Sequence, residues 1–175
     1  MSPIFRIANS THGGVDIRLL RYRDRAALRI LDRAEAATPR QLAILVYGHR
    51  RVAQRQLRSL WQAGLLERTI LPPEAKGGAE AAYRLSADAR RRLGDRSHRI
   101  RGSNRLRHTL DIVETVCALV TANGDPRTSS PVARWLPERM ARAHVGGPPF
   151  PDSILILNDR GRSATISLEV DEETQ

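Results

Sequence analysis

Apolar residues recur every three to four positions through the first third of the chain, which is the spacing of one face of an amphipathic helix. Thr38 and Pro39 supply an N-cap and a first helical residue for a short second helix. Gly64 stands where a C′ glycine typically ends a helix. The pattern therefore predicts three helices, at residues 18–36, 39–47 and 50–63.

Shorter apolar runs, separated by turn residues, follow these helices. Two of them, at 65–71 and 82–85, predict strands joined by a loop rich in Pro and Gly, and Ser86 caps a fourth helix at 87–93. Beyond an Arg-rich linker the pattern predicts a long helix at 104–122, a strand at 132–138 and a loop at 139–151. A hairpin of strands 152–157 and 163–171 follows. The expected fold class is α+β.

Charge separates the chain into two parts. Residues 1–110 hold 22 Arg, one Lys and nine acidic residues, a net charge of +14, whereas residues 111–175 hold six Arg and ten acidic residues, a net charge of −4. The total of +10 indicates a polyanionic partner, nucleic acid before membrane. We therefore expect a flexible tail at 1–17, a DNA-binding domain at 18–95, and a helix plus β-hairpin module at 104–175.

Three helices followed by a strand, a Gly-rich loop and a returning strand are typical of the winged helix-turn-helix. At about 100° per residue the predicted third helix has two unlike sides. The side that would hold it on its domain is formed by Ala53, Leu57, Leu60, Trp61 and Gly64. The opposite side carries Arg and Gln side chains, donors that suit phosphates and guanine edges. We expect this helix to enter the major groove of double-stranded DNA.

The candidate DNA-contacting residues come from this helix and its surroundings. Arg51, Arg55 and Arg58 are expected to supply most of the contact energy, and Lys76 is expected to reach the backbone or minor groove from the loop. The alternative interpretation is a solvated helix whose arginines cover apolar neighbours. The full predicted set is Arg40, Arg50, Arg51, Gln54, Arg55, Arg58, Gln62 and Lys76.

Several strings of the chain resemble the replication-relaxation family of bacterial mobile elements. The likeness lies in Thr38–Leu42, Arg50–Leu57, Leu60–Arg68, Tyr83–Ser86, His108–Leu110, Trp135, Pro151–Asp152 and Leu168–Asp171. The resemblance implies a winged-helix DNA binder that acts in plasmid replication or conjugative transfer, or in transcriptional control of the element. Family members usually continue beyond the last of these strings, so the resemblance also implies a shortened second module.

Acidic residues of the C-terminal hairpin suggest an alternative function. If the hairpin loop is 158–162, Asp152 lies opposite Leu168 and within about one residue of Glu169. Asp152, Glu169 and Asp171 would then cluster, and three carboxylates suit Mg²⁺ or Mn²⁺.

Such a cluster on a hairpin resembles part of a restriction-endonuclease-like core, so the alternative is a metal-dependent DNA nuclease. That core usually has Glu-x-Lys, whereas this chain has Asp171 in place of the lysine. The competing interpretation is a small β-module used for oligomerisation. On that interpretation, which we favour, the protein is not an enzyme and needs no cofactor.

Cysteine content and hydropathy bear on the compartment. Cys117 is the only cysteine, so no disulfide within the chain or zinc cluster is expected, which fits a reducing cytoplasm. No run of 18 apolar residues or signal-peptide core is present, and we expect a cytoplasmic protein without a membrane partner. We also expect a homodimer, since a single winged helix seldom contacts enough base pairs, with helix 104–122 as a candidate interface.

Overall fold

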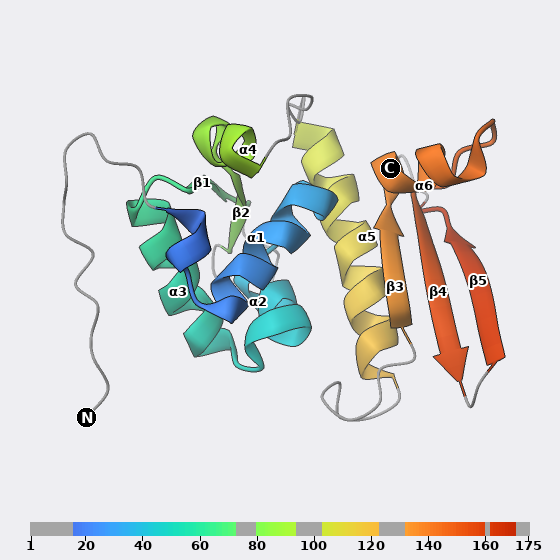
Figure 1. The fold of residues 1–175 in the computed structure, drawn as a ribbon, viewed down its shortest axis with the longest axis horizontal. Helices are drawn as coiled ribbons and strands as arrows, with labels where there is room; N and C mark the ends of the chain where they lie inside the picture. Colours follow the sequence, from blue (N-terminus) through green and yellow to red (C-terminus); the bar gives the residue numbers. More distant parts are fainter. Residues whose placement is uncertain (1–15, 73–79, 94–102, 123–131, 160–161, 171–175) are drawn as a thin grey trace.

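The computed structural model shows an α+β fold and describes residues 16–72, 80–93, 103–122, 132–159 and 162–170 (Figure 1). Its first part contains η1 (Ile17–Leu19), α1 (Tyr22–Ala34), α2 (Pro39–Leu42), η2 (Ala43–Tyr47), α3 (Arg50–Gln62), β1 (Leu66–Ile70), β2 (Ala81–Leu85) and α4 (Ala87–Leu93). Its second part contains α5 (Ser103–Thr121), β3 (Val132–Pro137), α6 (Glu138–Val145), β4 (Ser153–Asp159) and β5 (Arg162–Leu168). Helices combined with two small antiparallel sheets confirm the predicted fold class.

One apolar core joins α1, α2, η2, α3 and the β1–β2 sheet. Each large side chain buried in it stabilises the fold by about 1.5–3 kcal/mol. Its fully buried leucines are Leu28, Leu31, Leu42, Leu57, Leu65 and Leu85. The hydroxyl of Tyr47 donates to Asp24 Oδ1 at 3.0 Å within this core. Burial, together with the charge of Asp24, raises the pKa of Tyr47.

The helices that were predicted in this part are present, with two changes at their ends. The helix expected from residue 18 begins at Tyr22, because η1 and a bend precede it. The helix expected at 39–47 is α-helical only to Leu42 and continues as the π-helical turn η2. Gly48 ends that turn at φ 77°, a left-handed conformation that glycine adopts at little cost.

The long helix α5 lies between the N-terminal helices and the three-stranded sheet (Figure 1). Its Val113 and Cys117 are buried in the same core as α1 and α3, and Trp135 of β3 packs against that core. The apolar side of the helix is therefore covered within the chain. A dimer contact through α5 would therefore have to use residues outside this buried apolar side. The homodimer itself stays a prediction.

The C-terminal sheet has the strand order β3-β4-β5, both pairs being antiparallel. The predicted hairpin is present, but its predicted register is wrong by one residue: Leu157 pairs with Ala164 rather than with Ser163. The pairing continues to Asp159 and Arg162, so only two residues separate the strands. A two-residue connection is the commonest hairpin loop, and it replaces the five-residue loop that was expected.

The loop predicted at 139–151 is wrong over its first part, where the structure has α6. This α6 segment has only two large apolar residues, Met140 and Val145, and Ala141 is its one fully buried side chain among those described. Ala141 and Met140 pack on Leu136 and Ile154, so the sheet supplies the surface on which this helix forms. Contact across the fold, rather than local propensity, decides such a segment.

Candidate nucleic-acid interface

The helix α3 begins and ends at residues that satisfy its free backbone groups. His49, in extended conformation, accepts a hydrogen bond at Nδ1 from the backbone N–H of Arg51 at 3.2 Å and so acts as the N-cap. Gly64 follows the helix at φ 74°, and the N–H of Leu65 donates to the carbonyl of Leu60 at 3.0 Å. These ends fix which residues of α3 face outward.

The two predicted sides of α3 are present in the structure. Ala53, Leu57 and Leu60 are buried in the core, at 0, 0 and 5% exposure. The exposed side carries the predicted DNA-contacting residues of this helix, namely Arg51, Gln54, Arg55, Arg58 and Gln62. These five side chains, which we call the α3 stripe, therefore point away from the domain, as a groove-contacting surface requires.

Trp61 departs from the predicted division. It was placed on the buried side, yet 39% of it is exposed. The guanidinium carbon of Arg68, on the neighbouring strand β1, lies 5.7 Å from the centroid of its ring. A cation over an indole face is a favourable arrangement, and it keeps this tryptophan at the surface beside the end of α3. Nothing in the helical spacing alone indicated this pairing.

In the part of the chain that the structure describes, the three central arginines of the stripe have no acidic partner. Across the described part of the chain, no ion pair involves Arg51, Arg55 or Arg58. The sequence of α3 contains no Asp or Glu, so no i,i+4 pair within the helix can form. Neighbouring positive charges repel one another, and a polyanion on this side would relieve that repulsion.

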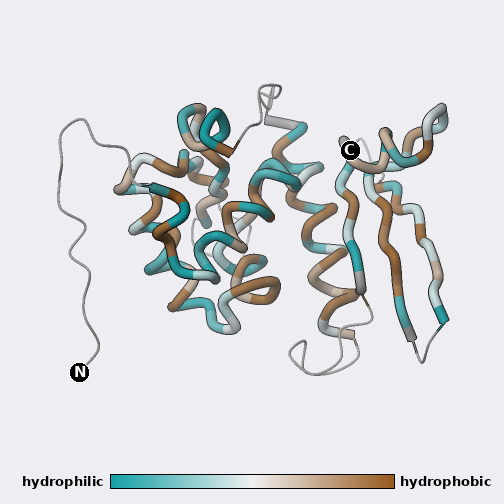
Figure 2. Tube along the Cα trace, viewed as in Figure 1, coloured by the Kyte–Doolittle hydropathy of each residue, from teal (hydrophilic) through white to brown (hydrophobic). Residues whose placement is uncertain are grey.

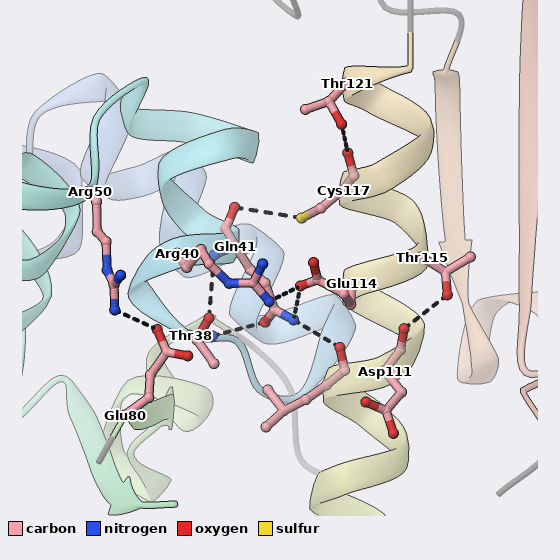
Figure 3. A network of polar contacts seen from close by, with 11 residues as sticks. Thr38, Arg40, Gln41, Arg50, Glu80, Asp111, Glu114, Thr115, Cys117 and Thr121 are labelled. Atoms are coloured by element: carbon pink, nitrogen blue, oxygen red, sulfur yellow. Dashed lines mark hydrogen bonds and ion pairs between the residues drawn. The ribbon is translucent and has the colours of Figure 1, made fainter. Parts of the chain in front are cut away.

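Arg50 and Arg40, which were also predicted to contact DNA, lie in different surroundings. Arg50 pairs with Glu80, immediately before β2, at 3.5 Å. Arg40 pairs with Glu114 of α5 at 2.9 Å (Figure 3). Both side chains remain about half exposed, at 59% and 52%. Any contact they make with DNA would compete with these ion pairs.

Gln41 explains why Arg40 lies against α5. Its side chain closes a capping box with Thr38, accepting from the Thr38 N–H at 3.0 Å. Its amide donates to the Leu110 carbonyl at 2.8 Å and to Glu114 at 3.2 Å (Figure 3). Because Gln41 is 2% exposed, this bridge fixes the start of α2 on α5 and brings the preceding arginine to Glu114.

A buried thiol completes this contact between α2 and α5, which we call the α2–α5 seam. Cys117 Sγ lies 3.8 Å from the carbonyl oxygen of Gln41. Burial first, and then the charge of Glu114, raise the pKa of Cys117 to about 12, although Arg40 opposes them. The thiol is therefore protonated at neutral pH and packs as a small apolar group.

The remaining basic candidates contribute less to an open positive surface. Lys76 lies outside the described residues. Arg84, on β2, pairs with Glu67 at 2.7 Å. On α4, Asp88 pairs with Arg91 at 3.4 Å and with Arg92 at 2.7 Å. Among the residues predicted to contact DNA, the α3 stripe is therefore the group whose arginines have no acidic partner in the described structure.

The comparison with protein families agrees with the strings singled out in the sequence. The model of the replication-relaxation family matches residues 28–175. The chain belongs to the replication-relaxation family. The match begins within α1 and includes α3, the α2–α5 seam and the whole C-terminal sheet. No curated protein matches the chain.

In this replication-relaxation chain the carboxylates proposed as metal ligands are placed differently from the prediction. Asp152 Oδ1 lies 3.2 Å from His108 Nε2, and its Oδ2 accepts from the Val170 N–H at 2.9 Å. Glu169 is exposed, and Asp171 lies outside the described residues. Within the described ranges, no three His, Cys, Asp or Glu residues are arranged to hold a metal ion.

The surroundings of Asp152 suit a structural role. The cleft beside it is lined by Glu35, Thr109, Trp135 and Glu138 among others, and its volume of about 20 Å³ is room for no more than about one water molecule. The neighbouring indole N–H of Trp135 donates to Ser153 Oγ at 2.7 Å. The His108–Asp152 contact joins α5 to the residue that precedes β4, and the Trp135–Ser153 bond joins β3 to β4.

None of the helices in the described part of the chain combines the length and apolarity that a membrane span requires.

Proposed function

We propose that this replication-relaxation protein binds double-stranded DNA through α3, with residues 18–95 acting as a winged helix-turn-helix. The observation that carries the proposal is the exposed row of Arg51, Arg55 and Arg58 without acidic partners in the described structure. The order of α2, η2, α3 and the antiparallel β1–β2 pair supports it. The protein acts in the cytoplasm as a homodimer, in replication or transfer of a mobile element or in its transcriptional control.

The proposed contact is both electrostatic and geometric. Residues three and four apart on a helix lie about 5–6 Å from one another, so the guanidinium groups form a continuous row. Phosphate contacts along this row position the protein, whereas Gln54 and the arginines that reach base edges give sequence preference. The Arg68–Trp61 pair borders the same helix end.

The salt dependence of duplex affinity tests this proposal. The triple variant Arg51→Ala, Arg55→Ala, Arg58→Ala should lose most of its affinity at moderate salt. The slope of log affinity against log salt should fall by about three, since each lost phosphate contact removes roughly one counterion. Fluorescence anisotropy with labelled duplex measures both quantities, and circular dichroism confirms that the variant is folded.

A matched control removes the same charge from the other part of the chain. Arg107, Arg134 and Arg142 are exposed on α5, β3 and α6. Their triple alanine variant should change affinity only slightly, through the net charge. An equal loss of affinity in both triple variants would contradict a specific role of α3 and indicate a diffuse charge effect.

The protein functions by binding rather than by catalysis, and it requires no cofactor. Support comes from Asp152, whose two carboxylate oxygens already contact His108 and the Val170 N–H. We expect supercoiled plasmid to remain intact with Mg²⁺ or Mn²⁺ at protein concentrations that saturate DNA. Cleavage that disappears in the Asp152→Asn variant would replace the binding proposal with the nuclease alternative.

A further inference from the structure

The two outer strands of the C-terminal sheet differ in how they are protected. An outer strand exposes backbone groups that can pair with another chain, and proteins block it with bulges, prolines or charges. β3 has an irregularity between Val132 and Arg134, ends at Pro137, and leads directly into α6. β3 also lies beside α5 (Figure 1).

β5 has neither a bulge nor a proline, and its one charged residue is Arg162 at its start. It pairs without interruption over seven positions from Arg162 to Leu168, and it contains neither Pro nor Lys. Within the described residues its only strand neighbour is β4, and no other described segment forms a backbone hydrogen bond with it. Its first four residues are exposed on both faces. The outer side of β5 is therefore a surface on which a further strand can add.

The face that β5 shares with buried β4 residues is apolar. Ile166 pairs with fully buried Leu155, and Ala164 pairs with Leu157. Ala164 is nevertheless exposed and Ile166 is only half-buried. The tube in Figure 2 is accordingly brown along most of β4 and paler along β5. A further strand would extend this apolar face and reduce its exposure to water.

The opposite charges at the two ends of β5 favour a second copy of β5, in antiparallel orientation, as the added strand. Exposed Arg162 begins the strand, and exposed Glu169 directly follows it. A second β5 in antiparallel orientation places the positive Arg162 end of each copy beside the negative Glu169 end of the other. A parallel copy would bring like charges together. We propose that β5 pairs antiparallel with β5 of a second copy, forming one continuous sheet across the homodimer.

This inference specifies the interface of the homodimer invoked in the proposed function. An antiparallel pair centred near Thr165 is symmetric and keeps Ala164 and Ile166 of both copies on the same face. One strand pair buries less than the roughly 1,000 Å² of a stable interface, so the dimer dissociates on dilution. Binding of two copies to one duplex raises their effective concentration and favours the pair.

Matched lysine substitutions distinguish β5 from α5 as the interface. Ala164→Lys places a charge in the proposed interface, whereas Ala118→Lys makes the same change at an exposed position of α5. Sedimentation equilibrium up to millimolar concentrations should show a monomer–dimer equilibrium for the natural chain. Ala164→Lys should raise the dissociation constant by about tenfold or more, because the lysine enters a symmetric interface twice. Ala118→Lys should leave it unchanged.

Charge reversal tests the antiparallel orientation. Arg162→Glu and Glu169→Arg should each weaken the dimer, since each single variant places like charges together at both ends. The double variant should restore dimerisation, because every Arg again meets a Glu. Failure of this restoration overturns the antiparallel pairing, and circular dichroism of each variant shows that β5 is still folded.

The outcomes separate this inference from DNA binding. A natural chain that remains monomeric at every concentration, or a dimer that only Ala118→Lys disrupts, overturns the β5 interface. Either result leaves the α3 contact with DNA intact, which the salt-dependence experiment measures separately. Conversely, a β5-dependent dimer that does not bind duplex overturns only the proposed function.

Discussion

Arg40 on α2 and Arg55 on α3 are the same residue type on consecutive helices, and both are exposed at the surface. Arg40 lies 2.9 Å from Glu114, and the Gln41 bridge beside it fixes α2 on α5 (Figure 3). Arg55 and its neighbours Arg51 and Arg58 have no such partner in the described structure.

The difference comes from a residue 74 positions away, since Glu114 is supplied by a helix of the acidic part of the chain. The count of arginines therefore indicates a polyanionic partner but not which arginines are available to it. An arginine in an ion pair, such as Arg40, contributes to the contact between helices. An arginine without an acidic partner in the described structure, such as Arg55, is available to bind a ligand. Four predictions test this division between the α3 stripe and the α2–α5 seam.

The largest expected effect concerns the two sides of α3. Leu57→Ala should lower the free energy of unfolding by about 2–5 kcal/mol, because it leaves a cavity at a fully buried position. Arg55→Ala should change it by no more than about 0.5 kcal/mol. Urea denaturation followed by circular dichroism measures both values. Comparable destabilisation by Arg55→Ala would mean that the stripe supports the fold.

The second prediction concerns the bridge in the α2–α5 seam. Gln41→Leu should cost about 1–3 kcal/mol, because the backbone N–H of Thr38 loses its acceptor in a buried setting. Gln62→Leu, the same change at an exposed position of α3, is the control and should be nearly neutral. Equal stability of the two variants would show that the seam does not depend on Gln41.

The third prediction concerns the thiol of the same seam. The pKa of Cys117 rises from 9.0 to about 12 in the fold, so the folded state favours the protonated thiol. This stabilisation is complete below pH 9 and is lost as the pH rises toward 12. The free energy of unfolding of the natural chain should therefore fall between pH 9 and pH 12 relative to that of Cys117→Ala. Urea titrations at several pH values measure this difference.

Alkylation provides an independent measurement of the same thiol. Iodoacetamide at pH 8 should modify the native protein very slowly and the urea-unfolded protein rapidly, as mass spectrometry will show. Rapid modification of the native chain would place Cys117 at the surface and contradict the packing of α5 on α2.

The smallest expected effect belongs to the Arg40–Glu114 ion pair. A double-mutant cycle with Arg40→Ala and Glu114→Ala should give a coupling below about 1 kcal/mol, since both side chains are partly exposed, and salt should reduce it. Arg40→Ala should also weaken duplex binding less than Arg55→Ala does. If its effect is as large, Arg40 leaves Glu114 to contact DNA.

The candidate site was predictable where local pattern decides the outcome. The heptad-like spacing of Ala53, Leu57 and Leu60 places Arg51, Arg55 and Arg58 on the opposite side, because a helix has a fixed rotation per residue. The Thr38–Gln41 capping box is equally local. Two residues of the predicted buried side are misplaced: Trp61 is 39% exposed beside Arg68 of β1, and Gly64 is exposed beyond the end of α3.

Long-range contacts were not predictable in the same way. The pairing of Asp152 with His108 depends on how β4 meets α5, and a one-residue error in the hairpin register altered the residues opposite each other. The helix α6 forms where the sheet offers a surface for Ala141 and Met140, a contact that the spacing of the segment did not specify.

The sequence by itself determined the helices and strands of the first part, the amphipathic division of α3, the family and the α+β class, since these follow from short-range spacing and from residue types. The tertiary structure decided which charged side chains are neutralised, how the acidic part packs on the basic one, and which outer strand has no described neighbour on its other side. These depend on contacts between residues far apart in the chain, and sequence spacing does not specify the distances between them.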